Sequence, residues 1–377
     1  MTMKLKLLAV AVAAVISTPA FAETEVKTKA GGGAKFKTDD VSIKVGGRLM
    51  YDIDWFDDEA FTGNTGSGSD SELRRARIYV SGEFGNWEAK VQGDFKDDGE
   101  TGLSDAYIQY NGWDDLELVL GKHKEPFGLE EQTSSKDITA IERTMVTNAL
   151  APGKNYGASL GSFSNEFTWM VGLYDHGDEG GNIATGVTGR MTFAPMVTKD
   201  EVFHLGFGYR QSRLAGNEYK DADQRLEIHT ADEKVGSGTI VGESITAYNF
   251  EVAYAAGPFH AQAEYFDAEV DGGINADTDI SGYYAQFGYV LTGESRPYSK
   301  GKFKRVSPKG DNGAWEILGR FSHYEPGSDE ADAFTLGLNY YASKAVRVGV
   351  NYVQGDLTEG GVDKDGNAIA VRFQYVF

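Results

Sequence analysis

The chain contains no cysteine, only eight prolines among 377 residues, and no long apolar run. Without cysteine no disulfide can form, so the fold depends on hydrogen bonds and side-chain packing. The longest apolar stretch, residues 7–17, has 11 residues, whereas a transmembrane helix needs about 20. The sequence therefore excludes a helical membrane protein. The mean hydropathy of −0.39 is typical of a soluble protein, but a barrel with a polar lumen has the same average because only alternate residues face lipid.

Residues 1–22 have the features of a secretory signal. Lys4 and Lys6 precede the apolar stretch, and Ala20-Phe21-Ala22 forms a small-residue cleavage pattern. We expect residues 23–40 to form a short N-terminal segment and residues 41–377 to form the folded domain. The signal holds two lysines and no acids, so the mature chain has 34 bases against 57 acids. This acidity argues against nucleic acid as a partner. Acidic external loops could instead share divalent cations with lipopolysaccharide of the outer membrane.

Glycine and aromatic residues are abundant, with 48 Gly, 21 Phe and 20 Tyr. The last nine residues, IAVRFQYVF, place Ile369, Val371, Phe373, Tyr375 and Phe377 on one face of a strand, and Ala370, Arg372 and Gln374 on the other. A strand of this kind, ending in an aromatic residue, is typical of the closing strand of an outer-membrane barrel. Since only helices and closed barrels satisfy every backbone amide in lipid, repeated alternation predicts a barrel.

The same alternation recurs in sixteen segments. They are residues 41–56, 72–84, 87–96, 103–110, 116–124, 156–164, 167–176, 187–196, 202–213, 245–256, 259–270, 281–291, 315–324, 334–342, 346–355 and 369–377. Short and long connections alternate along the chain, as expected for periplasmic turns and external loops. The predicted fold is all-β, a 16-stranded antiparallel transmembrane β-barrel, and a barrel of this size leaves an aqueous channel. Arg190, Arg210, Arg320, Arg347 and Arg372 fall on these strands, as lumen or rim residues or as members of a transport ladder.

Two connections depart from simple loops. Residues 125–154, the third external loop, lack strand alternation and contain helix-compatible sequence around 138–149. A loop this long can fold inward and narrow the channel, and a helix on it would offer backbone donors to an anion. Residues 294–312 should be periplasmic, yet the connection is long and carries the basic residues Arg296, Lys300, Lys302, Lys304, Arg305 and Lys309. This run is either a solvated connector or a segment folded into the pore exit that attracts anions.

Four motifs give a specific resemblance. FGLEEQTSSKDITAIER (127–143), LRRAR (73–77), SDAY (104–107) and TGESRPY (292–298) resemble the phosphate-selective porins O and P, and the similarity covers about residues 41–377. It implies a homotrimeric, cofactor-free porin of the bacterial outer membrane with an inward-folded third external loop at the constriction and a ladder of lumenal arginines. By position, the resemblance implies a central anion site of Arg48, Arg74, Arg75, Asp105, Ser134, Ser135, Lys136 and Arg143.

These residue types suit an oxyanion. Guanidinium groups bind phosphate bidentately, hydroxyls donate further hydrogen bonds, and a carboxylate can accept from a protonated phosphate oxygen. Strand parity places Arg48 and Asp105 in the lumen. For the adjacent pair Arg74 and Arg75 parity is ambiguous, since of the two only Arg75 shares the inward face with Arg77.

Glu131 departs from the family pattern, which has a lysine at this position before the two serines. Two unit charges about 4 Å apart interact by roughly 1 to 4 kcal/mol between water-like and surface-like dielectrics, so a pore-facing carboxylate would weaken anion binding.

The expected function is passive uptake of anions, phosphate or a related oxyanion. The alternative is a general or other-solute porin that tolerates cations. An enzyme is disfavoured because the six histidines are scattered and neither an HExxH nor a GxSxG motif is present; no metal site is expected.

Overall fold

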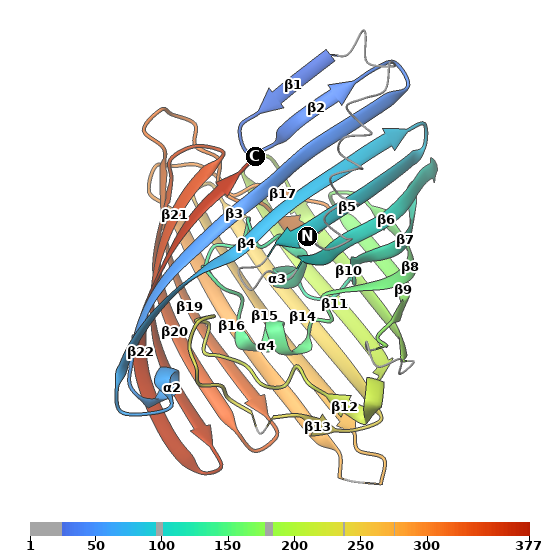
Figure 1. Cartoon of the computed structure of the whole chain (residues 1–377). Helices are drawn as coiled ribbons and strands as arrows, with labels where there is room; N and C mark the ends of the chain where they lie inside the picture. Colours follow the sequence, from blue (N-terminus) through green and yellow to red (C-terminus); the bar gives the residue numbers. More distant parts are fainter. Residues whose placement is uncertain (1–24, 96–100, 178–183, 237, 275) are drawn as a thin grey trace.

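The computed structural model describes residues 25–377, apart from residues 96–100, 178–183, 237 and 275. The predicted signal at 1–22 lies outside the described residues. Sixteen antiparallel strands form a closed barrel (Figure 1). They are β3 (Val41–Asp57), β4 (Ser67–Phe84), β5 (Trp87–Phe95), β6 (Thr101–Trp113), β7 (Leu116–Lys124), β8 (Lys154–Phe163), β9 (Phe167–Asp175), β10 (Thr185–Val197), β11 (Glu201–Arg213), β14 (Ser244–Ala256), β15 (Phe259–Asp271), β16 (Thr278–Val290), β19 (Ala314–Pro326), β20 (Glu330–Tyr341), β21 (Val346–Glu359) and β22 (Val362–Val376).

The closing strand pairs with the first barrel strand, from Asn367 opposite Asp57 to Val376 opposite Arg48. All sixteen predicted strands are confirmed. Several extend further at their external ends, and β22 begins at Val362 rather than 369. Alternation of apolar residues marks only the part of a strand that faces lipid. Beyond the lipid, ladder hydrogen bonds still join Asp363 to Thr358 of β21, so the hairpin continues although its sequence is polar.

The two faces of each strand differ in burial as the pattern requires. On β3, Leu49, Tyr51 and Trp55 are exposed on the outside, whereas Asp52 and Asp54 are buried on the inside. Aromatic pairs lie at the periplasmic ends, for example the exposed Trp87 with the half-buried Tyr110 and the exposed Trp315 stacked on the half-buried Tyr340, with ring centroids 4.6 and 4.4 Å apart. Such aromatic belts are found where a membrane barrel meets the water interface.

The segment before the barrel, predicted only as a short N-terminal segment, forms a hairpin of β1 (Glu25–Lys29) and β2 (Gly33–Lys37). Strand β2 pairs with residues Ser42 to Val45 of β3. This is the part of β3 that β22 does not reach, since β22 pairs no further than Arg48. The hairpin therefore covers an edge of the sheet that would otherwise be unpaired at the periplasmic rim.

Three external loops carry apolar side chains that pack against inward-facing strand residues. The first loop holds α2 (Glu59–Thr62), and the third holds α3 (Leu129–Gln132) and α4 (Met145–Leu150). The fifth holds η2 (Ala215–Asn217), β12 (Glu218–Tyr219) and β13 (Ile240–Val241). Phe61, Met145 and Leu226 from these loops share one buried cluster with Phe266 and Tyr324 of the barrel wall. The loops thus cover the inner surface of β14 to β22.

The prediction of helix around 138–149 is only partly right, because residues 138–144 are not helical. Their main-chain carbonyls accept hydrogen bonds from arginines of the barrel wall. Arg347 donates to the carbonyls of Ile138 and Thr139, and Arg372 donates to that of Ile141. A helix would need the same carbonyls for its own ladder, so the tertiary contacts replace helical hydrogen bonds.

Candidate functional site

A polar pocket of about 620 Å³ lies between the inner face of β3 to β8, the third external loop and the connector after β16. The side chains that line it include the bases Arg48, Arg75, Arg77, Lys90, Lys124, Arg143, Lys154 and Lys302 and the acids Asp94, Asp105, Glu117 and Glu131. The bases outnumber the acids although the chain as a whole has 57 acids against 36 bases. The positive charge is therefore concentrated where a solute would pass.

Arg48 on β3 is held by the third loop. Its Nη1 atom donates to Ser134 Oγ and Ser135 Oγ, both at 3.0 Å. The two serines follow Thr133, the residue that caps the C-terminus of α3. Arg48 is thus oriented by neutral hydroxyls, so its charge is not cancelled by a carboxylate contact.

Arg75 on β4 is the second guanidinium of the pocket. It is 8% exposed, and its Nε and Nη1 atoms have no hydrogen-bond partner among the residues that the structure describes. A buried charge is costly unless it is paired, and these two nitrogen atoms do not offset that cost.

Arg74 lies next to Arg75 but outside the pocket lining. A β-bulge adds one residue to β4 between the pairs Met50–Arg75 and Asp52–Glu72. The bulge lets two neighbouring arginines reach inward, which simple parity does not allow. Arg74 then forms a bidentate pair with Glu142 of the third loop, with its Nε atom at 2.8 Å. Its role in the structure is to hold the loop.

Asp105 is buried in the pocket wall and is already paired. Lys154 Nζ lies 2.8 Å and Lys90 Nζ 3.3 Å from the same carboxylate oxygen. Lys154 also donates to Ser104 Oγ at 2.9 Å. The SDAY motif thus supplies a hydroxyl and a carboxylate that position two lysines at the edge of the pocket.

Glu131 and Arg143 both line the pocket and bind each other. The Glu131 carboxylate lies 2.9 Å from Lys124 Nζ and 3.1 Å from Arg143 Nε. Burial raises the pKa of Glu131, but Arg143 and Lys124 lower it more, so its pKa lies below the ordinary value. Glu131 therefore stays ionised and neutralises charge that would otherwise face the pore.

Lys136 lies outside the pocket lining. Its carbonyl accepts a hydrogen bond from Gln374 at 3.1 Å. Burial lowers the pKa of Lys136 to about 8; Asp137 opposes this shift, whereas Arg305 and Arg48 add to it. The resemblance thus places eight residues in one site, and the structure brings six of them together, leaving out Arg74 and Lys136.

The backbone donors at the start of α3 are occupied. The amides of Leu129 and Glu130 donate to the carboxylate of Glu264 on β15, at 2.6 and 2.8 Å. An internal carboxylate therefore binds the amides at the start of α3, which lies outside the stretch 138–149 where a helix was expected.

The basic connector 294–312 contacts the inner wall of the barrel rather than extending as a solvated chain. It forms β17 (Tyr298–Ser299) and β18 (Lys302–Phe303). Tyr298 Oη lies 2.7 Å from His204 Nδ1, and Arg190 donates to the carbonyl of Gly301 at 2.9 Å. Phe303 is buried in one cluster with Leu129 of α3. The segment brings Lys302 into the pocket lining, and the unbroken basic run was its signal in the sequence.

The strand arginines bind loops more than they line the pocket. Arg320 pairs with Glu130 and Glu227, from the third and fifth loops, and Arg210 donates to the carbonyl of Leu150. Arg372 pairs with Asp52 and Glu142. These residues are inward-facing, as expected, but within the described residues their charges are matched by loop carboxylates and carbonyls.

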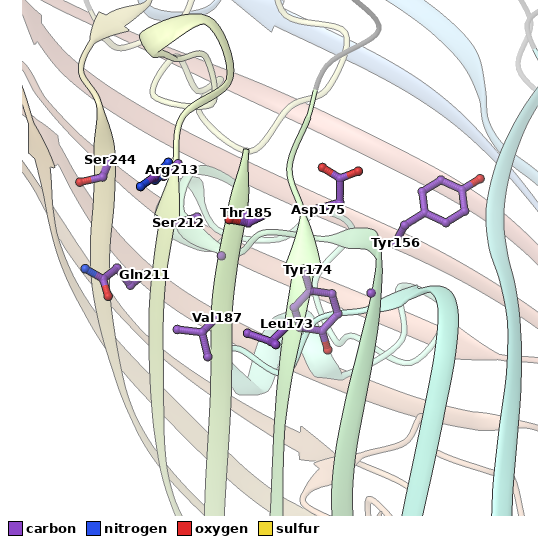
Figure 2. Close-up of a pocket in the computed structure, with 12 residues that line it drawn as sticks. Tyr156, Leu173, Tyr174, Asp175, Thr185, Val187, Gln211, Ser212, Arg213 and Ser244 are labelled. Carbon is purple, nitrogen blue, oxygen red and sulfur yellow. The ribbon is translucent and has the colours of Figure 1, made fainter. Parts of the chain in front are cut away.

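A second cavity of about 910 Å³ lies at the external ends of β8 to β11 and β14 (Figure 2). Tyr156, Leu173, Asp175, Thr185 and Arg213 are among its lining residues. It holds one base and one acid among otherwise neutral side chains, and it shares no residue with the polar pocket.

No helix in the described part of the chain is long and apolar enough to span a membrane. The described residues also contain no group of three or more His, Cys, Asp or Glu side chains that could hold a metal ion.

A closed sixteen-stranded barrel with an apolar outer face and a charged inner pocket defines an outer-membrane porin, a channel rather than an enzyme. The chain belongs to the phosphate-selective porin O and P family, whose sequence profile matches residues 43–377. It is 31% identical to Porin O of Pseudomonas aeruginosa, over 97% of each chain. Two similar solved structures are a loop-deletion mutant of the outer membrane protein OmpT of Vibrio cholerae and an anion-selective porin of Comamonas acidovorans. Their TM-scores are 0.62 and 0.61, and they are 14% and 12% identical to this chain. Each match covers 90% of this chain and 100% of the other chain.

Proposed function

We propose that this porin is a passive channel for anions of the phosphate class. The observation that carries the proposal is the pair Arg48 and Arg75 in the polar pocket. Within the described part of the chain, Arg75 is buried with two unpartnered nitrogen atoms, and the side-chain hydrogen bonds of Arg48 go to the hydroxyls of Ser134 and Ser135. Two guanidinium groups without carboxylate partners suit a tetrahedral oxyanion, which can accept bidentate hydrogen bonds.

The third loop forms the constriction in this proposal. It supplies Ser134, Ser135 and Arg143 to the pocket, and the wall arginines Arg347 and Arg372 hold its backbone by hydrogen bonds to its carbonyls. A loop tied at several points along its length keeps a defined distance to β3 and β4. The constriction is thereby prepared before an anion arrives, which reduces the ordering cost of binding.

Lysines on the pocket edge supply the approach and the exit. Lys90 and Lys154 share one carboxylate, that of Asp105, and Lys302 lines the pocket from the connector. Such a field raises the local anion concentration without fixing the ion. Transport then follows the concentration gradient, and binding has to be weak enough for release.

A homotrimer and contact with lipopolysaccharide are part of the same proposal. OmpT of Vibrio cholerae, which has this fold, has been solved in a trimer form. Acidic residues gather on the external hairpin of β21 and β22, where Asp356, Asp363 and Asp365 line one rim cavity. Carboxylates at this level could share divalent cations with anionic lipopolysaccharide.

A general porin is the second candidate, favoured by the four acids of the pocket. Asp94, Asp105, Glu117 and Glu131 each lie within 3.3 Å of a basic group. If these pairs cancelled the positive field, small cations and neutral solutes would pass as well as anions.

The reversal potential of the purified protein in a planar bilayer under a KCl gradient separates the two candidates. We expect anion selectivity, and we expect added phosphate to block the chloride current in a saturable manner. Cation selectivity, or a chloride current that phosphate does not reduce, would contradict the oxyanion site and favour the general porin.

A further inference from the structure

Most cations of the polar pocket have a carboxylate partner. Arg77 Nη2 lies 2.7 Å from Asp94, and Lys154 and Lys90 both contact Asp105. Lys124 and Arg143 share the single carboxylate of Glu131. Among the described residues, Arg48 and Arg75 are the guanidinium groups of the lining that have no carboxylate within ion-pair distance, and Lys122 and Lys302 are the lining lysines that also lack one.

Glu131 holds its two bases through both its side chain and its backbone. The carboxylate lies 2.9 Å from Lys124 Nζ and 3.1 Å from Arg143 Nε, and the Glu131 carbonyl accepts hydrogen bonds from both side chains. Arg143 also donates to the carbonyl of Thr133 at 2.9 Å. The donors of Lys124 and Arg143 are therefore largely used within the protein. An anion in the pocket would have to compete with an ionised carboxylate to reach them.

We propose that Glu131 determines which oxyanions the pocket accepts, restricting it to compact oxyanions with a single anionic group. Such an ion binds between Arg48 and Arg75, and the carboxylate of Glu131 repels a second anionic group attached to it. Without the carboxylate, Lys124 and Arg143 would form a second anion position in the same pocket. This inference rests on the proposed function and adds the class of substrate.

The test compares orthophosphate with pyrophosphate, which carries two phosphoryl groups. The concentration of each that half-blocks the chloride current is measured in planar bilayers for the wild-type porin, Glu131→Gln and Glu117→Gln. Glu117 is the matched control, since it lines the same pocket and pairs with Lys300 at 3.0 Å. Both variants remove one negative charge from the lining, but Glu131→Gln frees two lining bases, Lys124 and Arg143, whereas Glu117→Gln frees Lys300, which is not in the lining.

In Glu131→Gln we expect block by pyrophosphate to strengthen about tenfold or more, as removal of a close like charge implies. Block by orthophosphate should change less than about threefold, because Arg48 and Arg75 are unaltered. In Glu117→Gln the block of the chloride current should change by a similar factor for the two anions. Equal strengthening for both anions in Glu131→Gln would show a general field effect and would overturn the inference, as would no change.

Two further measurements keep the test decisive. If Glu131→Gln does not assemble, judged by heat-dependent mobility in detergent gels, Glu131→Asp replaces it. This shorter carboxylate cannot contact both bases, so the ratio of the two half-blocking concentrations should move in the same direction by about two- to threefold. An unmoved ratio overturns the inference while the proposed function stands. A wild-type porin that neither anion blocks overturns the proposed function, and the inference with it.

Discussion

Replacement of Arg75 by glutamine separates anion binding from stability more sharply than any other single change in the pocket. Arg75 is buried, and its Nε and Nη1 atoms have no hydrogen-bond partner among the described residues. If phosphate accepts hydrogen bonds from this group, the variant loses a charge-assisted interaction of about 1.5 to 3 kcal/mol. Since 1.4 kcal/mol corresponds to a factor of ten, phosphate should block the chloride current about 10- to 100-fold more weakly.

The same variant should be at least as stable as the wild-type porin. Removing a buried charge that lacks a partner relieves its desolvation cost instead of breaking a pair. The assay combines phosphate titration of the chloride current with thermal unfolding in detergent. Arg77→Gln is the matched control, because it removes the same charge from the same lining but leaves Asp94 without the base that lies 2.7 Å away. The assignment of Arg75 as a phosphate-binding group would be refuted if phosphate blocked the chloride current of the Arg75→Gln porin as strongly as that of the wild type. It would also be refuted if the block were weakened no more than in Arg77→Gln.

Three further predictions follow from the contacts around the pocket. Arg372→Gln leaves the buried carboxylates of Asp52 and Glu142 without their shared base, so the free energy of unfolding should fall by about 3 to 5 kcal/mol; an unchanged midpoint in urea-induced unfolding would contradict this. Phe303→Ala removes the buried ring that packs with Leu129 and should cost about 3 to 5 kcal/mol and broaden the distribution of single-channel conductances; a sharp, wild-type distribution would show that the connector does not support the third loop. Because burial lowers the pKa of Lys136 and of the pocket-lining Lys302 to about 8, their positive charges are lost as the pH rises through that value, and anion selectivity should fall between pH 7 and 9. Lys136→Gln and Lys302→Gln should each reduce this step, and an unchanged pH profile in both variants would contradict the assignment.

At β4, the pairing with β3 decides which arginines reach inward. Alternation predicted the strand and the inward direction of Arg75 and Arg77, because a strand places every second side chain on one face. Alternation could not predict that Arg74 also reaches inward to Glu142. Between the pairs Met50–Arg75 and Asp52–Glu72, β4 has one residue more than β3, and this extra residue changes which side chains of β4 face inward. A bulge of this kind depends on how two strands pair, and the sequence of one strand does not contain that information.

The third loop shows the same division. Its length and its lack of alternation marked it as the candidate constriction. Its conformation, however, depends on groups distant in the chain. Arg347 donates a hydrogen bond to the carbonyl of Ile138, and Glu264 accepts hydrogen bonds from the amides at the start of α3. Local helix propensity is weak compared with such buried hydrogen bonds, so helix-compatible sequence at 138–144 remains non-helical.

The sequence by itself determined the number of strands, their direction, the side of each strand that faces lipid and the identity of the basic residues. The physical reason is local: lipid requires apolar side chains at alternate positions, and turns require short polar connections. Only the tertiary structure decided which cations are neutralised. Glu131 pairs with Lys124 and Arg143, and Asp105 pairs with Lys154 and Lys90, whereas Arg48 and Arg75 have no carboxylate partner in the part of the chain that the structure describes. Charge pairing depends on distances of about 3 Å between groups far apart in the chain, and the closed barrel alone sets those distances.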